Sequence, residues 1–367
     1  MVDYTRQDIA GLKMNQRENL NNLFRRSGYS YAPVEFKLCP ALMKKFKEIY
    51  GVEASPETVF DFPWRYVNTP LLSRKFTDWM PYYPDKKFNP GTEIDDFLVA
   101  HEPTPESMHM SRMYHPMRNF DSIESFENFP FPEFAAENQA LLKTEVDGIH
   151  SKELSATAFM QMTIWEQAWY MRSMDELMVD MMTESENAVY LFDRITGLAA
   201  VRAEAYALAG VDILQLGDDI GMQQAPMMSV EFYRQWLKNR LKQVIGKAKQ
   251  INPAIIITYH SCGFITPFIP ELIDAGVDVL NPVQPECMDF AEIHREFGKD
   301  ISFWGTIGTQ TTMPFETPDK VKQAVWRNLD IAGRAGGLFC APTHLLEPEV
   351  PWNNIEAYVE ACRKYAL

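Results

Sequence analysis

A histidine and a cysteine two residues apart follow one apolar segment of this sequence. Residues 255–258 are strand formers and lead into Tyr259, after which the chain reads His260, Ser261, Cys262. An apolar run without alternation is typical of a strand buried on both faces of a parallel sheet. Side chains two apart in extended chain point to the same side. Imidazole and thiolate are good zinc ligands. The pair is therefore a candidate metal site, although a packed thiol beside a hydrogen-bonded histidine is the commoner arrangement.

Polar residues also follow four other predicted strands, at 211–216, 277–280, 301–305 and 337–340. In a (β/α)8 barrel the carboxyl ends of the strands converge on one face, where active sites are built. Five polar clusters in this position favour an enzyme over a binding scaffold. The four additional clusters contain Asp218 and Asp219, then Asn281, Gln284, Glu286 and Cys287, then Thr306, Thr309 and Gln310, then Thr343 and His344.

Some of these residues have structural alternatives. Asp218 and Asp219 could act in catalysis or only cap the turn that follows them. Cys340 lies inside a predicted strand, which favours a packed thiol, whereas His344 lies four residues later in a loop and can reach the site. The choice between Cys340 and His344 as a further metal ligand stays open.

The strands that carry these clusters alternate with helical segments. Apolar periodicity predicts further strands at 156–163 and 254–259, and helices at 133–148, 164–182, 188–209, 229–250, 267–275, 290–297 and 318–335. Strands alternating with helices indicate parallel βαβ units. With at least six such units and no GxGxxG motif, we expect an α/β fold of the (β/α)8 TIM-barrel class.

The first 150 residues have a different character. Helices are predicted at 4–28 and 40–50, whereas 60–132 is rich in proline, aromatic residues and methionine and predicts short strands and ordered loops. We expect one domain over 1–367, in which 1–150 form an elaboration packed on the barrel and 151–367 supply the core βα units.

Composition excludes several classes of function. The chain has 367 residues and a formal charge of −15, so a nucleic-acid-binding surface is not expected. No apolar run approaches the ~20 residues of a membrane span, and the amino terminus lacks the apolar core of a signal peptide. The five cysteines are odd in number and scattered, unlike a disulfide framework. We expect a cytoplasmic protein with reduced thiols.

Several segments resemble the uroporphyrinogen decarboxylase superfamily. They read GDDIG at 217–221, GVDVLNPVQPE at 276–286, FWGTIGTQ at 303–310 and PTHLLEPEVPWNNIEAYVEA at 342–361. Upstream, residues 163–181 are similar as well, so the resemblance covers about 160–365 well and the first 150 residues loosely. It implies a (β/α)8 barrel.

The superfamily has two branches, and the sequence is more similar to the zinc methyltransferases of corrinoid pathways. True decarboxylases carry an RQAGRY-type segment, from which the RRSGY at 25–29 departs. The methyltransferases share the His-x-Cys-Gly after the strand. Their thiol-methylating members take a third ligand from a late P-G-C segment, and aligning PxxNI at 351–355 places His344 there. The resemblance thus implies Zn²⁺ held by His260, Cys262 and His344.

A site with one thiolate and two imidazoles would keep a net charge of +1, which suits Lewis-acid chemistry at an oxygen. The expected reaction is methyl transfer from an O-methyl donor to the Co(I) corrinoid of a partner protein. Asp218 or Asp219 would complete the coordination or deliver a proton. The aromatic residues near the site favour a methoxylated aromatic donor. The residues expected to bind it are Tyr259, Trp304, Gln310 and Trp165.

Other functions stay open at this point. Methanol, methylamines and betaine-like compounds are alternative donors, and methylcorrinoid:thiol methyl transfer is an alternative reaction. The main alternative is metal-free decarboxylation of uroporphyrinogen, followed by a non-catalytic relative that only binds corrinoid protein or porphyrin. The oligomeric state is also open, with a homodimer among the options.

Overall fold

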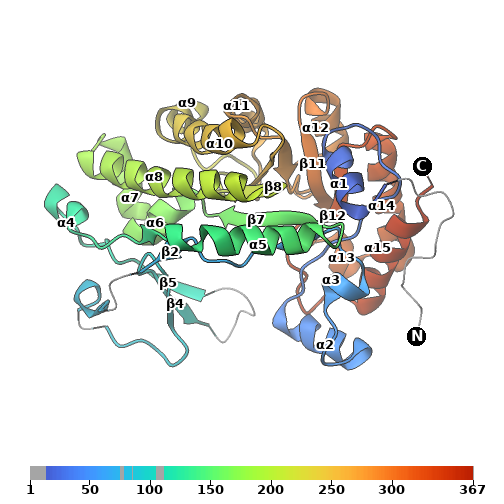
Figure 1. The fold of residues 1–367 in the computed structure, drawn as a ribbon, viewed down its shortest axis with the longest axis horizontal. Helices are drawn as coiled ribbons and strands as arrows, with labels where there is room; N and C mark the ends of the chain where they lie inside the picture. Colours follow the sequence, from blue (N-terminus) through green and yellow to red (C-terminus); the bar gives the residue numbers. More distant parts are fainter. Residues whose placement is uncertain (1–13, 75–77, 85, 105–110, 367) are drawn as a thin grey trace.

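A parallel sheet of seven strands forms the centre of the computed structural model, which describes residues 14–74, 78–84, 86–104 and 111–366 (Figure 1). The strands follow the order β1-β7-β8-β9-β10-β11-β12, and every neighbouring pair is parallel. This confirms the predicted α/β class. The strand bounds are β1 Trp64–Tyr66, β7 Ser155–Gln161, β8 Ile213–Gly217, β9 Ile256–His260, β10 Val279–Asn281, β11 Ser302–Ile307 and β12 Leu338–Pro342.

The sheet curls until its two edges approach each other. The ring of Trp64 on β1 lies 4.9 Å from that of Trp304 on β11 and 5.1 Å from that of Phe339 on β12, between centroids. Parallel sheets twist in one sense, and continued twist brings the edges together. These three rings lie on what we call the inner face of the sheet.

An extended segment at 34–38 lies at the seam between the two edges. Its one described ladder contact is a parallel bridge between Leu38 and Leu346, just beyond β12. The amide and carbonyl of Glu35 both bond the hydroxyl of Tyr358, at 3.4 and 3.1 Å, instead of a neighbouring strand. The segment therefore contributes no regular eighth strand, and the described sheet has seven strands where the sequence predicted eight.

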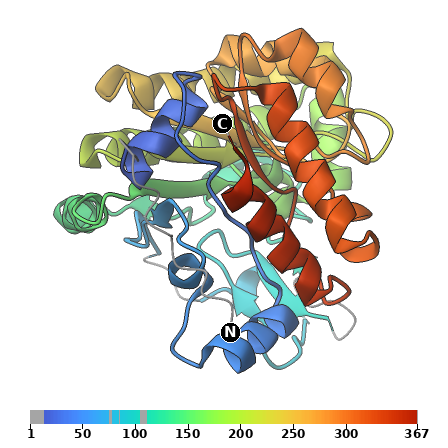
Figure 2. The same cartoon turned by 90° about the vertical axis from the view of Figure 1, so that its right-hand side faces the viewer.

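Helices cover the outer face of the sheet. In Figure 1, α8 and α10 run side by side, and Figure 2 shows the same for α14 and α15. The helix predicted at 164–182 is divided at Ser173, whose φ is +77°. The helices after the first strand are α4 Ile123–Glu127, α5 Gln139–His150, α6 Trp165–Arg172, α7 Met174–Met182, α8 Glu186–Ala209, α9 Val230–Tyr233, α10 Asn239–Ile251, α11 Ile269–Ala275, α12 Phe290–Phe297, α13 Thr312–Phe315, α14 Pro318–Ala332 and α15 Trp352–Lys364.

The amino-terminal part of the chain contributes to the sheet itself, because β1 comes from the region predicted as short strands and loops. Elsewhere in that region short strands join two small antiparallel sheets with loops between them, as expected. Part of the helix predicted at 4–28 lies outside the described residues. The remaining elements are α1 Gln16–Phe24, α2 Pro40–Tyr50, α3 Pro56–Val59, β2 Leu72–Ser73, β3 Glu93–Ile94, β4 Ala100–Pro103, β5 Ser111–Tyr114 and β6 Glu133–Phe134.

One hydrophobic core joins these parts, with buried apolar side chains from Leu20 in α1 to Cys362 in α15. Among the helices of the described ranges, none combines the length and the apolar character that crossing a membrane requires.

A buried carboxylate attaches α1 to the sheet at the amino end of β8. Asp212 accepts hydrogen bonds from the Arg17 guanidinium at 2.8 Å and from the Ala156 amide at 2.9 Å, and lies 2.8 Å from His150 Nε2. Burial alone would raise the pKa of Asp212, but the bonds from His150, Arg17 and Ala156 outweigh it and lower that pKa. The charged form of Asp212 therefore stabilises the fold.

Replacing Asp212 with asparagine is expected to lower the free energy of unfolding by about 2 to 3 kcal/mol, because Arg17, His150 and the Ala156 amide lose the charged acceptor of their hydrogen bonds. Because the folded pKa is depressed, this contribution is present above the unfolded value of about 3.9 and is lost as pH falls through the folded pKa. Denaturant unfolding of wild type and Asp212→Asn, at neutral pH and at successively lower pH below 4, measures both effects. The exposed Asp300→Asn is the control, and equal stabilities at neutral pH would contradict the assignment.

Candidate metal centre

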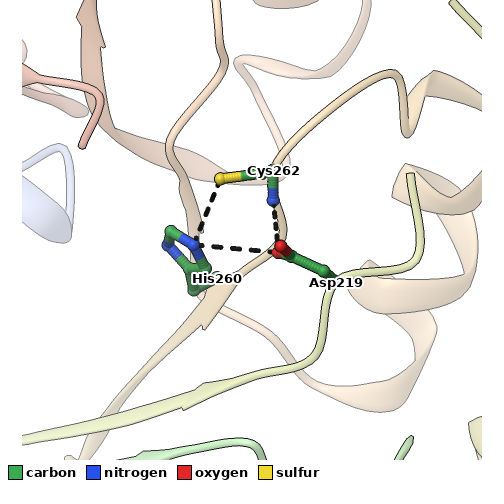
Figure 3. A group of neighbouring side chains, drawn as sticks. All are labelled: Asp219, His260 and Cys262. Atoms are coloured by element: carbon green, nitrogen blue, oxygen red, sulfur yellow. Dashed lines mark hydrogen bonds and ion pairs between the residues drawn. The ribbon is translucent and has the colours of Figure 1, made fainter. Parts of the chain in front are cut away.

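Three donor atoms meet at the carboxyl ends of β8 and β9. The side chains of Asp219, His260 and Cys262 each place a possible ligand atom within 4.8 Å of the other two (Figure 3). Cys262 Sγ lies 3.4 Å from His260 Nε2, which lies 3.8 Å from Asp219 Oδ1. A carboxylate, an imidazole and a thiol facing one point are a donor set that suits zinc.

Two glycines make room for this group. Gly217 pairs with His260 across β8 and β9, and a Cβ at Gly217 would lie 2.6 Å from the His260 carbonyl oxygen. Gly263 has a φ of +84°, and a Cβ there would lie 2.7 Å from the carbonyl oxygen of Met222. A side chain at either position would push the two loops apart. The glycines of the GDDIG and HSCG segments thus bring Asp219 against His260 and Cys262.

Asn281 on β10 fixes the orientation of the His260 ring. His260 Nδ1 lies 2.6 Å from Asn281 Oδ1, and the Asn281 amide nitrogen donates to the Trp304 carbonyl oxygen at 2.8 Å. With the amide so assigned, Nδ1 carries the proton and Nε2 presents its lone pair to Cys262 and Asp219. Metal-binding histidines are commonly oriented by such a hydrogen bond at the ring nitrogen that does not bind the metal.

The electrostatic surroundings of the group also suit a cation. Burial raises the pKa of the Cys262 thiol, and the negative charges of Asp219 and Glu166 raise it further. Asp219 Oδ1, the oxygen that faces His260 Nε2, also accepts a hydrogen bond from the Cys262 amide at 2.7 Å. A divalent cation would offset this accumulated negative charge and stabilise the thiolate. The residues present therefore fit a metal ion.

Glu166, on α6, is a member of the site that the sequence analysis missed. Burial raises the pKa of Glu166 to about 8, and Asp219 and Asp218 add to the rise. Its carboxylate accepts a hydrogen bond from Tyr170 at 3.2 Å. No local motif marks this glutamate, because only the packing of α6 beside the loop after β8 brings it to Asp219.

Asp218 has a structural position rather than the expected catalytic one. It is 3% exposed, and its carboxylate accepts hydrogen bonds from the amides of Ile164 and Glu166 at 3.0 and 2.9 Å. These amides lie at the amino end of α6, so Asp218 caps that helix from another strand. Asp218 thus acts as a cap, but of α6 and not of the following turn as the sequence suggested, while its neighbour Asp219 joins the group.

His344 and Gln310 line a cavity of about 560 Å³ between the loops, together with Cys262. His344 is not a member of the three-residue group, in which Asp219 takes the place expected for it. The alternative ligand Cys340 lies on the face of β12 opposite Phe339, fully buried, and its carbonyl accepts from Tyr358 at 3.0 Å. Burial raises the pKa of Cys340 to about 12, and the thiol remains a packed one.

The expected aromatic residues are divided between two environments. Tyr259 and Trp165 are 1% and 0% exposed, and alternation along β9 turns Tyr259 away from His260. Neither offers surface to a ligand, which corrects the expectation for both. Trp304 does face the inner side of the sheet, against Trp64 and Phe339.

The group of Asp219, His260 and Cys262 is expected to bind one equivalent of Zn²⁺ per protein chain. Asp219→Asn and Cys262→Ser should each weaken binding by at least about tenfold, since even the loss of a residue that only orients a ligand costs that much. His344→Gln should leave the affinity unchanged. Competition with a chromophoric chelator measures the affinities, with Asp300→Asn as the control. A loss for His344→Gln and none for Asp219→Asn would restore the ligand set inferred from sequence.

Comparison with known proteins agrees with this fold. A methyltransferase from Methanosarcina mazei superposes with a TM-score of 0.66 over 95% of this chain and 98% of that chain, at 17% identity. Xylanase 10B from Thermotoga maritima matches 63% of this chain and 81% of that chain at 11% identity, with a TM-score of only 0.40. No curated protein sequence matches the chain. The family model of uroporphyrinogen decarboxylase covers residues 108–365, well over half of the chain, which therefore belongs to the uroporphyrinogen decarboxylase family.

Proposed function

We propose that this protein is a methyltransferase that moves a methyl group from an oxygen-linked donor to the Co(I) corrinoid of a partner protein. The observation that carries the proposal is the group of Asp219, His260 and Cys262 at the carboxyl ends of the strands. A metal-free decarboxylase has no need of such a donor set. These three residues would hold zinc, which when bound supplies Lewis acidity toward the donor oxygen.

The ligand set changes the charge argument made from the sequence. With Asp219 in place of His344, a zinc site has a net formal charge of zero and not +1. The preference for oxygen then rests on ligand hardness. One thiolate with an imidazole and a carboxylate is a harder set than two thiolates, and it leaves a position for an oxygen ligand.

The reaction can be written with this chain's residues in stated roles. The bond between the methyl carbon and the oxygen breaks as the electron pair of Co(I) forms a cobalt–carbon bond. The oxygen leaves with both electrons of the broken bond. The departing oxygen needs a proton or a cation, because a phenolate is a poor leaving group. Asp218 is occupied by helix amides, so Glu166, beside Asp219, is the residue best placed to give that proton.

Aromatic side chains on the inner face support a methoxylated aromatic as the donor. Phe159 on β7 is 39% exposed although it pairs with Gln215 on the inner side, and its ring lies 6.3 Å from that of Tyr66. A planar ligand can pack on the exposed part of the Phe159 ring beside Tyr66.

Exposed apolar side chains around the strand ends support a protein partner. Met162 follows β7, Met222 follows β8 and Phe315 ends α13, and they are 37%, 50% and 75% exposed. Apolar side chains near a site that a bulky acceptor must reach are typical of a docking surface.

The enzyme with reduced corrinoid protein and methoxybenzoates should form methyl-Co(III), followed by its absorption spectrum. Asp219→Asn and Cys262→Ser should each lower the rate by at least about a hundredfold, the scale of lost electrostatic stabilisation. Asp300→Asn should leave it unchanged. Absence of methylcobalt from every aryl ether, with release of CO₂ from uroporphyrinogen, would favour the decarboxylase instead.

Replacing Phe315 with glutamate should raise the KM for the corrinoid protein several-fold, because it puts a charge into the proposed docking surface. The KM for the methyl donor should stay as in wild type. Steady-state kinetics with each substrate varied in turn measures the two values, and Phe315→Leu is the matched variant. An equal rise in both KM values would argue against a docking role.

A further inference from the structure

A lysine from the seam segment lies at the inner face of the sheet. Lys37 Nζ is 5.4 Å from the centre of the Phe159 ring and 5.7 Å from that of Tyr66. Within the described part of the chain, Lys37 has no carboxylate partner in an ion pair. An exposed ammonium between two rings, without a counter-ion, is able to bind an anion that arrives with an aromatic group.

Unpartnered polar atoms lie on the same face of the sheet. Gln215, Thr157 and Thr258 are 0%, 0% and 1% exposed, and their register with Tyr66 and Phe159 turns them to the inner face. Gln215 Nε2 and both threonine hydroxyls find no hydrogen-bond partner in the described residues. Buried polar groups are nearly always satisfied in proteins, so these atoms mark a part of the inner face that is polar without being satisfied by the described side chains.

This part of the inner face adjoins the metal centre. Thr258 and His260 lie two apart on β9 and face the same side, so Thr258 lies one step below the histidine. Phe159 is on β7, two strands away from β9, which is about 10 Å. A para-substituted benzene ring and the end of a lysine side chain together can bridge that span.

We propose that Lys37, with Tyr66 and Phe159, forms a subsite for a carboxylate on the ring of the methyl donor. The inference rests on the proposed function and adds the substrate class, an aromatic carboxylate. The carboxylate lies against Lys37, the ring lies on the exposed side of Phe159 beside Tyr66, and the methoxy group points to the side of His260. Lys37 positions the donor and takes no part in bond breaking.

Glu35 is the acid that faces Lys37 from the same segment. It is 4% exposed, and burial raises the pKa of Glu35 to about 7, with Lys37 acting in the opposite direction. The carboxyl of Glu35 therefore does not hold a full negative charge at neutral pH. It leaves Lys37 able to attract a second carboxylate.

Direct binding of 4-methoxybenzoate to the enzyme without corrinoid protein tests the subsite. Calorimetric titration at neutral pH should show binding to wild type and at least tenfold weaker binding to Lys37→Met, since a charge-assisted bond is lost. Lys37→Arg should keep most of the affinity. The exposed Lys44→Met, with the same change of charge, should bind as wild type does. The uncharged isostere 4-methoxybenzamide should bind wild type and Lys37→Met equally.

The outcomes separate the subsite from the reaction. Equal binding of the acid to wild type and Lys37→Met, or equal weakening by Lys44→Met, overturns the subsite whatever the activity. A failure of wild type to bind the acid overturns it as well. If binding depends on Lys37 but no methylcobalt forms from any aryl ether, the subsite stands and the proposed reaction is wrong.

Discussion

The close approach of β8 and β9 at Gly217 and His260 is the constraint on which the site depends. With no side chain at Gly217, the two backbones lie near enough for the aspartate after β8 to meet the histidine and cysteine after β9. Gly263 holds the following turn against Met222 in the same way. The strands could pair without these glycines, but their loops could not then share one point in space. The donor group is thus a product of backbone packing as much as of the ligands themselves.

The same region concentrates negative charge that the fold does not neutralise. Asp219 and Glu166 lie beside the Cys262 thiol, and Asp218 lies behind them against the amides of α6. Helix amides stabilise the innermost carboxylate, since the amino end of a helix favours an anion. Burial and the charge of Asp219 raise the pKa of Glu166 to about 8, so Glu166 is largely protonated at neutral pH. A divalent cation beside Asp219 and Cys262 would favour the ionised forms of these groups.

Much of this arrangement could be predicted from the sequence, because local patterns determine it. Apolar runs followed by polar residues located six strands of the sheet, and the His-x-Cys spacing located two of the three donors. The remainder depended on contacts between distant segments. Asp218 and Asp219 are identical in type and adjacent, so only the packing of α6 separates the helix cap from the candidate ligand. The sequence placed Tyr259 at the site, but alternation along β9 points its side chain to the outer face of the sheet. β1 was not predicted because it is too short to show a periodic pattern.

Tyr358 has a consequence for how the two ends of the chain depend on each other. Its hydroxyl meets the amide and carbonyl of Glu35 and the carbonyl of Cys340, so α15 joins the seam segment to β12. The part of the inner face that the seam segment forms is therefore supported by α15 and not by a strand ladder. A substitution in α15, far along the chain from Lys37, would therefore change the position of the seam segment. The loops after β8 and β9 are held by the close contacts at Gly217 and Gly263 and would not be affected. Sequence variation in α15 would then change which methyl donor the protein binds and leave the metal ligands in place.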